Sequence, residues 1–277
     1  MDFQNINITD DEFRRFSVFV KSNYGINLME KKRALVKSRL YNVLLQYGFT
    51  SFTEYFDFVR SDKTGNSLNT LINKITNHTF FMRESEHFKY FRNNVLPYLK
   101  TSVRVKDLGI WSAGCSSGEE PYTLAMIIDE FFSDEKMWWD TEILATDISS
   151  KVLDTARQGI YSSESIADIP NRWKINYFKK HDDDTFEIDK RIKKEVIFRK
   201  FNLMEEIFPF KRKFHVIFCR NVMIYFDNHT KNKLVNKFYD FTERGGYLFI
   251  GHSESINRDE TAYKYIMPAV YRKERGV

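Results

Sequence analysis

Cysteine is scarce in this chain of 277 residues, which contains only Cys115 and Cys219. The two residues lie far apart and form no Cys-x-x-Cys pair, so the sequence indicates no disulfide framework. The chain opens without a charged-then-apolar leader, and no apolar run reaches the roughly 18 residues that a membrane-spanning helix needs. We therefore expect a reduced, cytoplasmic protein that does not insert into a membrane.

The sequence also lacks a strong charge imbalance and a metal-binding spacing of histidine. Its formal net charge of +5 is mild and does not choose between nucleic acid, a membrane surface and an acidic protein as a partner. The six histidines form no pattern such as His-Glu-x-x-His, so we propose no metal from the sequence. The hydrophobic content of 42% is enough to bury the core of one large domain or two smaller ones.

The first third of the sequence has the period and the end signals of helices. Thr9 and Glu12 form a capping box before an apolar-periodic run, which Gly25 ends. Further helical patterns cover residues 28–48, 52–61 and 67–76. We expect an all-helical N-terminal domain over residues 1–85.

From about residue 105, short apolar runs alternate with helix-length segments. This pattern is typical of βαβ units with a largely parallel sheet. The candidate strands lie within residues 108–114, 142–148, 195–203, 215–221 and 246–252. A polar stretch between the second and third strands is longer than an ordinary crossover, which favours a small antiparallel β subdomain inserted at about 160–195. We expect an α/β domain over residues 86–277.

The first candidate strand leads into a glycine turn and then into a helix. Gly114 and Gly118 frame the turn, and Glu119 and Glu120 open the helix. Nucleotide-like ligands meet a helix N-terminus at such a turn, although the spacing here is not Gly-x-Gly-x-x-Gly. Two acids at this place disfavour a phosphate and favour a ligand with a positive or hydroxyl-bearing part. The alternative is an ordinary turn, whose first-turn acids interact with the helix dipole.

Three further candidate strands end in polar residues. Asp147 ends the second strand, where an acid of a doubly wound sheet accepts hydrogen bonds from ribose hydroxyls; capping the next helix is the alternative role. The third strand leads to Asn202 and Leu203, and the fourth leads to Arg220 and Asn221. Because the carboxyl ends of parallel strands meet at one edge of a sheet, these residues together predict a ligand site there.

A fifth polar segment precedes the predicted sheet, at residues 75–88. Its Asn77, Thr79 and Arg83 lie around two phenylalanines, so a bent segment would point the three polar groups one way. A plain domain linker is not usually so aromatic. Pairing of Arg83 with a neighbouring glutamate is the alternative.

These segments resemble the CheR family of chemotaxis receptor methyltransferases, which methylate receptor glutamates with S-adenosylmethionine. The matching strings are TNHTFFMRESEHF, WSAGCSSGEEPY, ATDISSKVLDTARQGIY, FNL, FCRNVMIYF and GHSES, in family order between about residues 75 and 255. The resemblance implies a helical, receptor-facing N-terminal domain, a Rossmann-like methyltransferase domain and a small inserted antiparallel β subdomain.

The resemblance also implies the roles of individual residues. The cofactor contacts would be Asn77, Thr79, Arg83, one or both of Glu119 and Glu120, Asp147, Asn202, Leu203, Arg220 and Asn221. Arg83 and Tyr225 match the positions near the methyl transfer, and Met82 departs from the family pattern just before Arg83. We expect S-adenosylhomocysteine as the product, cytoplasmic helices of methyl-accepting chemotaxis receptors as the partner, and a monomer.

Two other classes of enzyme stay open on the residues alone. GCSSG is formally a nucleophile elbow with Ser116, and Asp147 and His252 follow in hydrolase order. However, no oxyanion segment precedes the elbow, and the glutamates after it would oppose a developing oxyanion. A nucleic-acid methyltransferase fits the positive charge, but the basic residues are scattered and no Asn-Pro-Pro-Tyr-like segment is present. We therefore favour glutamate methylation and expect no nucleic-acid partner.

Overall fold

The computed structural model of the chain describes residues 6–28, 30, 33–65, 67, 68, 70–72 and 79–274. These residues form two units, one of Met1–His78 with Tyr225–Asp227 and the other of Thr79–Ile224 with Asn228–Val277. No helix among the described residues is long and apolar enough to cross a membrane. The domain boundary that we place after residue 85 from the sequence stays a prediction.

Helices make up the first unit, and the first helix follows the capping signals of the sequence. α1 (Asp10–Tyr24) begins at the predicted capping box, in which the Glu12 N–H donates to Thr9 Oγ1 and the Thr9 N–H donates to the Glu12 carboxylate. Gly25 ends this helix with a φ of 68°, which confirms the predicted stop. α2 (Arg33–Tyr47) and α3 (Phe52–Ser61) follow, and residues 67, 68 and 70–72 are also helical.

The predicted start of the second helix at residue 28 is wrong. Leu28 is non-helical and buried, and its carbonyl accepts a hydrogen bond from the Ser17 hydroxyl of α1 at 3.4 Å. In the same connection, the Asn27 N–H donates to the carbonyl of Tyr225 at 2.5 Å, which ties the distant segment Tyr225–Asp227 to this unit. Tertiary contacts, which a helical period does not reveal, thus hold this connection in a non-helical form.

The second unit is built on a seven-stranded sheet in the order β6-β2-β1-β7-β8-β10-β9. The parallel strands are β1 (Ile110–Ala113), β2 (Ile143–Asp147), β6 (Val196–Lys200), β7 (Phe214–Cys219) and β8 (Thr242–Ile250). β9 (Lys264–Met267) and β10 (Val270–Arg272) add an antiparallel hairpin beside β8. The predicted parallel sheet is therefore confirmed, while the hairpin is an addition that the sequence reading missed.

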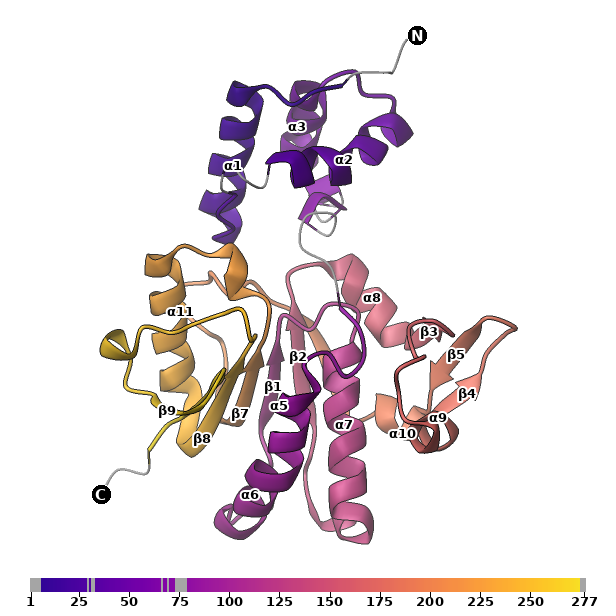
Figure 1. Cartoon of the computed structure of the whole chain (residues 1–277), viewed down its shortest axis with the longest axis vertical. Coiled ribbons are helices and arrows are strands. Elements are labelled where there is room, and N and C mark those ends of the chain that lie inside the picture. The colour runs from indigo at the N-terminus through magenta and orange to yellow at the C-terminus, as the bar shows by residue number, and fades with distance from the viewer. Residues whose placement is uncertain are drawn as a thin grey trace. The chain divides into compact units, whose positions relative to one another are not determined.

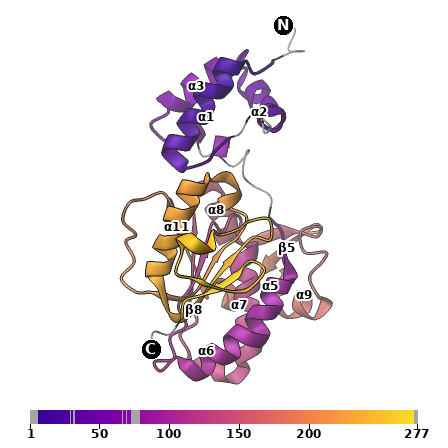
Figure 2. The ribbon, with the colours of Figure 1, turned by 60° about the vertical axis from the view of Figure 1, so that its left-hand side comes forward.

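Helices cover both faces of this sheet (Figures 1 and 2). The main ones are α5 (Ser85–Tyr90), the π-helical turn η2 (Phe91–Val95), α6 (Leu96–Ser102), α7 (Glu119–Phe132), α8 (Ser150–Gln158) and α11 (Asn228–Phe241); η3 (Ser133–Trp138), η4 (Met223–Tyr225) and η5 (Arg258–Glu260) are short 3-10 turns. Right-handed crossovers place α7 and α8 on one face and α11 on the other. The segment from α5 to α6 runs alongside α7 (Figure 1).

A three-stranded antiparallel sheet is inserted between β2 and β6, in the order β3-β5-β4. Its elements are β3 (Ile160–Ser162), α9 (Asn171–Tyr177), β4 (Phe178–Lys180), β5 (Thr185–Ile188) and α10 (Lys190–Lys193). This is the small β subdomain expected from the long polar stretch. The fold class expected from the sequence is thus confirmed.

The strand order reverses between β1 and β7, and aromatic packing fixes these strands on both faces. β1 lies next to both β2 and β7, although β7 comes much later in the chain. Trp111 of β1 is fully buried among aromatic rings of β7 and of the segment before it, and its Nε1 donates to Thr146 Oγ1 of β2 at 2.9 Å. On β7, Phe218 stacks on Phe249 of β8, with ring centroids 4.3 Å apart. The core therefore holds the carboxyl ends of β1 and β7 side by side, where doubly wound sheets bind ligands.

Candidate active site

The turn after β1 is tied to β2 by its backbone. The N–H groups of Gly114 and Cys115 both donate to the Thr146 carbonyl, at 2.8 and 2.9 Å. Gly114 has a φ of 91°, and an added Cβ would lie 2.4 Å from a methyl carbon of Val222. Glycine is therefore required here both by the backbone conformation and by the close approach of the loop after β7.

Asp147 holds this turn in place instead of capping the next helix. Its Oδ2 accepts from the Ser116 N–H and its Oδ1 from the Ser149 N–H, both at 2.9 Å. Ser149 itself is the N-cap of α8, because its hydroxyl accepts from the Val152 N–H. Burial raises the pKa of Asp147, although the backbone N–H groups around the carboxylate oppose the rise. The carboxylate thus lies at the carboxyl end of β2, next to the glycine turn.

The two glutamates at the start of α7 have different surroundings. Glu120 bridges two partners: its Oε1 accepts from the Ser112 hydroxyl at 2.7 Å, and its Oε2 accepts from Arg220 Nη1 at 3.0 Å. Glu119 accepts from the hydroxyl of Ser117 at 2.9 Å. Burial raises the pKa of both glutamates. A positively charged ligand group is the natural complement of such desolvated carboxylates.

Arg220 lies at the centre of a buried network at the end of β7. Besides Glu120, its guanidinium donates to Oε2 of Glu84 at 3.2 Å and to the backbone carbonyl of Arg83. Only 3% of the Arg220 side chain is exposed, and its Cζ lies 4.9 Å from the centre of the Phe88 ring. The guanidinium therefore joins two carboxylates from different segments.

Glu84 is a central residue of this site that the sequence reading did not assign. It accepts from Arg220 and also from the Asn221 amide at 3.0 Å, and its φ of 56° is unusual for a residue other than glycine. Burial by itself would raise the pKa of Glu84, but the hydrogen bond from Asn221 and the charge of Arg220 bring it below its ordinary value. Nothing local in the sequence signals this pairing, since more than a hundred residues separate the partners.

Glu254 is a second functional residue that the sequence reading missed. Its carboxylate accepts backbone hydrogen bonds, among them those from Gly251 (2.5 Å), Ile224 (3.0 Å) and Asn221 (3.1 Å). Asn221 has a φ of 58°, so Glu254 stabilises a sparsely populated backbone conformation. The only sequence signal was its place in the string GHSES. Burial raises the pKa of Glu254.

The remaining candidate residues lie at the ends of nearby segments or outside the described part of the chain. Oδ1 of Asn202 accepts from the Met204 N–H at 3.0 Å, and Leu203 is buried. The Phe201 N–H donates to the Asp147 carbonyl at 3.0 Å, which joins the ends of β6 and β2. Among the other candidates, Thr79 and Arg83 lie just before α5, Tyr225 is grouped with the N-terminal unit, and Asn77 lies outside the described residues.

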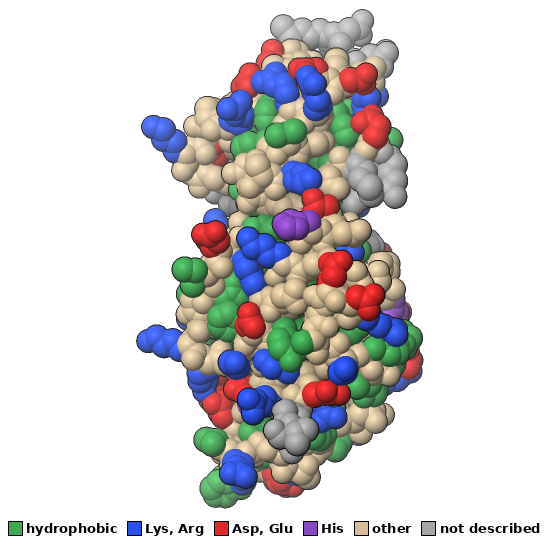
Figure 3. Space-filling view, turned by 90° about the vertical axis from the view of Figure 1, so that its left-hand side faces the viewer, with side chains coloured by type: hydrophobic (Ala, Val, Ile, Leu, Met, Phe, Trp, Pro, Cys, Tyr) green, Lys and Arg blue, Asp and Glu red, His purple; other side chains and the backbone are tan. Residues whose placement is uncertain are grey.

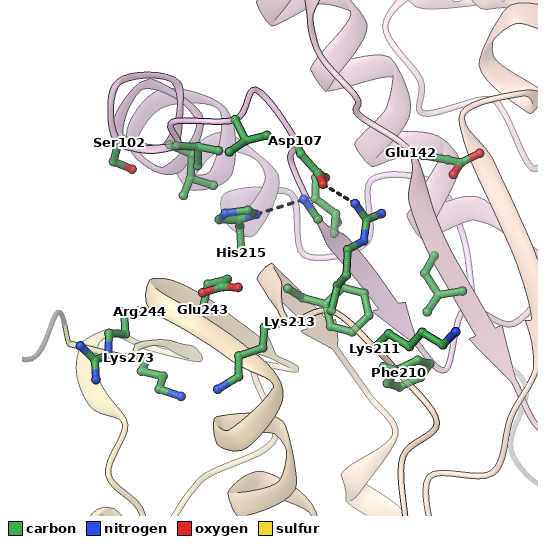
Figure 4. A pocket seen from close by; sticks show the side chains of 18 of the residues that line it. Ser102, Asp107, Glu142, Phe210, Lys211, Lys213, His215, Glu243, Arg244 and Lys273 are labelled. Atoms are coloured by element: carbon green, nitrogen blue, oxygen red, sulfur yellow. Dashed lines mark hydrogen bonds and ion pairs between the residues drawn. The ribbon is translucent and has the colours of Figure 1, made fainter.

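A large cavity of about 1500 Å³ lies at the opposite, amino edge of the sheet. Figure 4 shows cationic side chains around it, among them Lys213, Arg244 and Lys273, and His215, whose ring accepts a hydrogen bond from the Gly109 N–H at 3.1 Å. The described candidate residues lie outside its lining. The glycine turn and the polar strand ends meet instead at the carboxyl edge, which is the candidate active site.

Comparisons with known proteins show the family of this chain. The family model of the CheR methyltransferase SAM-binding domain matches residues 77–271, and that of the CheR methyltransferase all-alpha domain matches residues 11–76. The chain belongs to the CheR methyltransferase family. It is 49% identical to the chemotaxis protein methyltransferase of Borreliella burgdorferi, over 97% of this chain and 96% of that protein. The chemotaxis protein methyltransferase of Escherichia coli K12 is 31% identical, over 97% of this chain and 92% of that protein.

Membership of the CheR family identifies the cofactor as S-adenosylmethionine. The residues at the carboxyl edge fit this molecule, which carries a sulfonium, an ammonium and ribose hydroxyls. The carboxylates of Glu119, Glu120 and Asp147 provide negative charge and hydrogen-bond acceptors, and the glycine turn allows close approach of a ligand to the backbone. The chain is therefore a methyltransferase whose site residues suit its cofactor.

The serine hydrolase and nucleic-acid alternatives are not favoured. Ser116 Oγ is buried and has no hydrogen-bond partner among the described residues, whereas a triad serine is hydrogen-bonded to its histidine. His252 instead packs against His87, with ring centroids 4.3 Å apart. On the face drawn in Figure 3, Lys and Arg side chains are interspersed with Asp and Glu and form no single basic stripe.

Proposed function

We propose that this protein transfers the methyl group of S-adenosylmethionine to glutamate side chains of chemotaxis receptors. The products are glutamyl methyl esters and S-adenosylhomocysteine. The observation that carries this proposal is the full-length match to chemotaxis methyltransferases, together with a carboxyl edge whose residues suit the cofactor. We further propose that the protein acts in the cytoplasm as a monomer and uses no nucleic-acid partner.

Several side chains would hold the cofactor at the carboxyl edge. Asp147 would accept hydrogen bonds from the ribose hydroxyls, because it ends β2 beside the glycine turn. Glu119 and Glu120 would face the positive groups, since both are desolvated carboxylates at the start of α7. The other proposed contacts are Asn77, Thr79, Arg83, Asn202, Leu203, Arg220 and Asn221.

Arg220 has a positioning role in this proposal. Its two terminal nitrogens donate to Glu84, Glu120 and a backbone carbonyl, while its Nε has no hydrogen-bond partner among the described residues and is left for the cofactor. Arg220 therefore also fixes the orientation of the two carboxylates. Asn221 supports the same arrangement through its amide, which donates to Glu84.

The chemistry of glutamate methylation does not require a general base. When bound, the cofactor supplies a methyl group on a positively charged sulfur, toward which an ionised carboxylate is already a nucleophile. The protein has to align the carboxylate with that methyl group and exclude water. We propose that Arg83 and Tyr225 orient the receptor carboxylate. Very strong binding of this carboxylate would slow methyl transfer, because it stabilises a negative charge of the substrate that disappears as the ester forms.

The substrate segment in this proposal is an acidic cytoplasmic helix of a methyl-accepting receptor. We assign receptor contact to the N-terminal helical domain, residues 1–85, and methyl transfer to residues 86–277. The basic side chains of α2, among them Arg33 and Lys37, lie on the element best suited to meet acidic residues. Arg33, however, already pairs with Glu30 at 3.0 Å, so a receptor carboxylate would have to compete for it.

The test is methyl transfer from radiolabelled S-adenosylmethionine to a purified cytoplasmic receptor fragment, followed by treatment with base. We expect label in the receptor and its release as volatile methanol, because carboxyl methyl esters hydrolyse in base. Label that resists base would show another kind of methyl acceptor. The Asp147→Asn variant is the control for enzyme-dependent labelling, and it should label the receptor much more slowly.

A further inference from the structure

Glu84, His87 and His252 form a cluster of metal-ligating side chains in the second unit. Glu84 directly precedes α5 and His87 lies three residues later in this helix, while His252 comes from the segment after β8. Each offers one ligand atom, and these atoms all lie within 4.8 Å of one another. The fold thus brings together two histidines that are far apart in the sequence, which is why no metal-ligand spacing appears there.

His87 is the unusual member of this cluster, because its imidazole is buried without a hydrogen-bond partner. The side chain has no exposed surface, and neither ring nitrogen has a hydrogen-bond partner among the described residues. Its Nδ1 lies 3.4 Å from Oε2 of Glu84, but the two are not aligned as a hydrogen bond. Buried polar atoms are rarely left unpaired, because each costs roughly 1–3 kcal/mol. A metal ion at this place would accept the nitrogen lone pair that the described residues leave unused.

The distances suit a tetrahedral ion. Zinc bonds to carboxylate oxygen and imidazole nitrogen are about 2.0–2.2 Å long, which places neighbouring ligand atoms roughly 3.3 Å apart. The 3.4 Å between Glu84 Oε2 and His87 Nδ1 matches one edge of such a tetrahedron. His252 is exposed, so its ring can close the remaining distance without disturbing the core. Two histidines and one glutamate are also a known set of zinc ligands.

The charge around the cluster is compatible with a cation in spite of Arg220. The guanidinium lies 3.2 Å from the same oxygen of Glu84 and opposes a metal ion by its charge. However, Arg220 also pairs with Glu120 at 3.0 Å, so its single positive charge is divided between two carboxylates. Two carboxylates, Glu84 and Glu120, therefore share one guanidinium, and a divalent cation would offset the excess of negative charge.

We propose that Glu84, His87 and His252 bind a divalent transition-metal ion of the zinc type. Glu84 also holds Arg220 and Asn221, so an ion on this carboxylate competes with the arrangement at the end of β7. Metal binding accordingly weakens the binding of S-adenosylmethionine. This second effect rests on the proposed cofactor contacts, whereas metal binding itself does not.

The direct test is titration of the full-length, untagged protein with Co²⁺, followed by displacement with Zn²⁺. We expect one equivalent of Co²⁺ to give the strong visible absorption of a tetrahedral site, and Zn²⁺ to remove it. His252→Ala should weaken binding at least about tenfold and abolish the band. His181→Ala is the matched control, because His181 is an exposed histidine of the β subdomain outside the cluster, and this variant should bind as the wild type does.

Two outcomes would overturn the metal site. One is the absence of a tetrahedral Co²⁺ band in the wild type, and the other is equal affinity in wild type and His252→Ala. Glu84→Gln gives an independent check, since it keeps the shape of the side chain but removes the anionic ligand. It should also lose the band, and retention of the band would contradict the assignment of this carboxylate.

A calorimetric titration with S-adenosylmethionine, with and without Zn²⁺, tests the coupling separately. We expect Zn²⁺ to weaken cofactor binding at least fivefold in the wild type and to leave it unchanged in His252→Ala. Tight metal binding with unchanged cofactor affinity would overturn the coupling while leaving the metal site in place. Failure of receptor methylation would affect neither measurement, so the proposed function and this inference are tested independently.

Discussion

Replacement of Arg220 by methionine should destabilise the second unit strongly. The side chain is almost fully buried, and it compensates the charges of Glu84 and Glu120 at 3.2 and 3.0 Å. Methionine fills a similar volume but leaves both carboxylates without their cation. Loss of one partner of a buried ion pair costs about 3–5 kcal/mol, and we expect the free energy of unfolding to fall by that amount.

The loss of stability in Arg220→Met should depend on pH, and the direction of this dependence can be checked. In the wild type, the pKa of Glu84 is lowered, so its ionisation adds stability above its unfolded-state pKa and this stability is lost as the pH falls. Without Arg220, burial raises the pKa of both glutamates. As the pH falls, protonation removes their uncompensated charge and so reduces the destabilisation of the variant. The difference in stability between wild type and variant should therefore shrink from neutral pH toward acidic pH.

Urea denaturation followed by circular dichroism measures both effects. The double variant Arg220→Met with Glu84→Gln is the informative control, because it removes the uncompensated charge and should recover part of the lost stability. A loss below about 0.5 kcal/mol in Arg220→Met would refute the reasoning, since that is the size of an ordinary surface substitution. A stability difference that grows on acidification would equally contradict it.

Three further predictions concern the cofactor site. Asp147→Asn should weaken binding of S-adenosylmethionine at least tenfold in calorimetry, whereas Lys213→Glu, at the cavity of the opposite edge, should leave it unchanged. Tyr225→Phe should lower turnover in the methylation assay while cofactor affinity stays near that of the wild type. Glu254→Gln should lower the free energy of unfolding by about 1–3 kcal/mol, because backbone N–H groups at Asn221 and nearby lose a charged acceptor.

Each of these predictions has a contradicting result. A Lys213→Glu variant with weakened cofactor binding would move the site toward the amino edge of the sheet. Lost cofactor affinity with unchanged turnover in Tyr225→Phe would refute the proposed orienting role of the tyrosine. Unchanged stability of Glu254→Gln would show that the loop after β7 does not depend on this carboxylate.

The strand ends of the second unit could be predicted because parallel strands leave a local signal. Buried apolar runs stop at a polar residue, and Asp147 and Arg220 both follow such runs. The N-terminal helix was predictable for a similar reason, since its capping box lies within a few neighbouring residues. The fold class, and the edge of the sheet at which the candidate residues meet, could therefore be predicted from local sequence.

Contacts between distant segments could not be predicted in this way. A local reading pairs Arg83 with a neighbouring glutamate, but Glu84 binds Arg220 and Asn221 across the fold. The edge hairpin of β9 and β10 was missed because its strands are only four and three residues long. Likewise, the spacing of the histidines gives no hint that His87 and His252 meet.

Mass-spectrometric mapping of the modified receptor residue tests the central claim most directly. A receptor cytoplasmic fragment would be incubated with the protein and S-adenosylmethionine, digested under acidic conditions that preserve esters, and sequenced by fragmentation. The account predicts a methyl group on glutamate side chains, absent when the protein or the cofactor is left out. A methyl group on lysine, arginine or another residue, with glutamates unmodified, would contradict it.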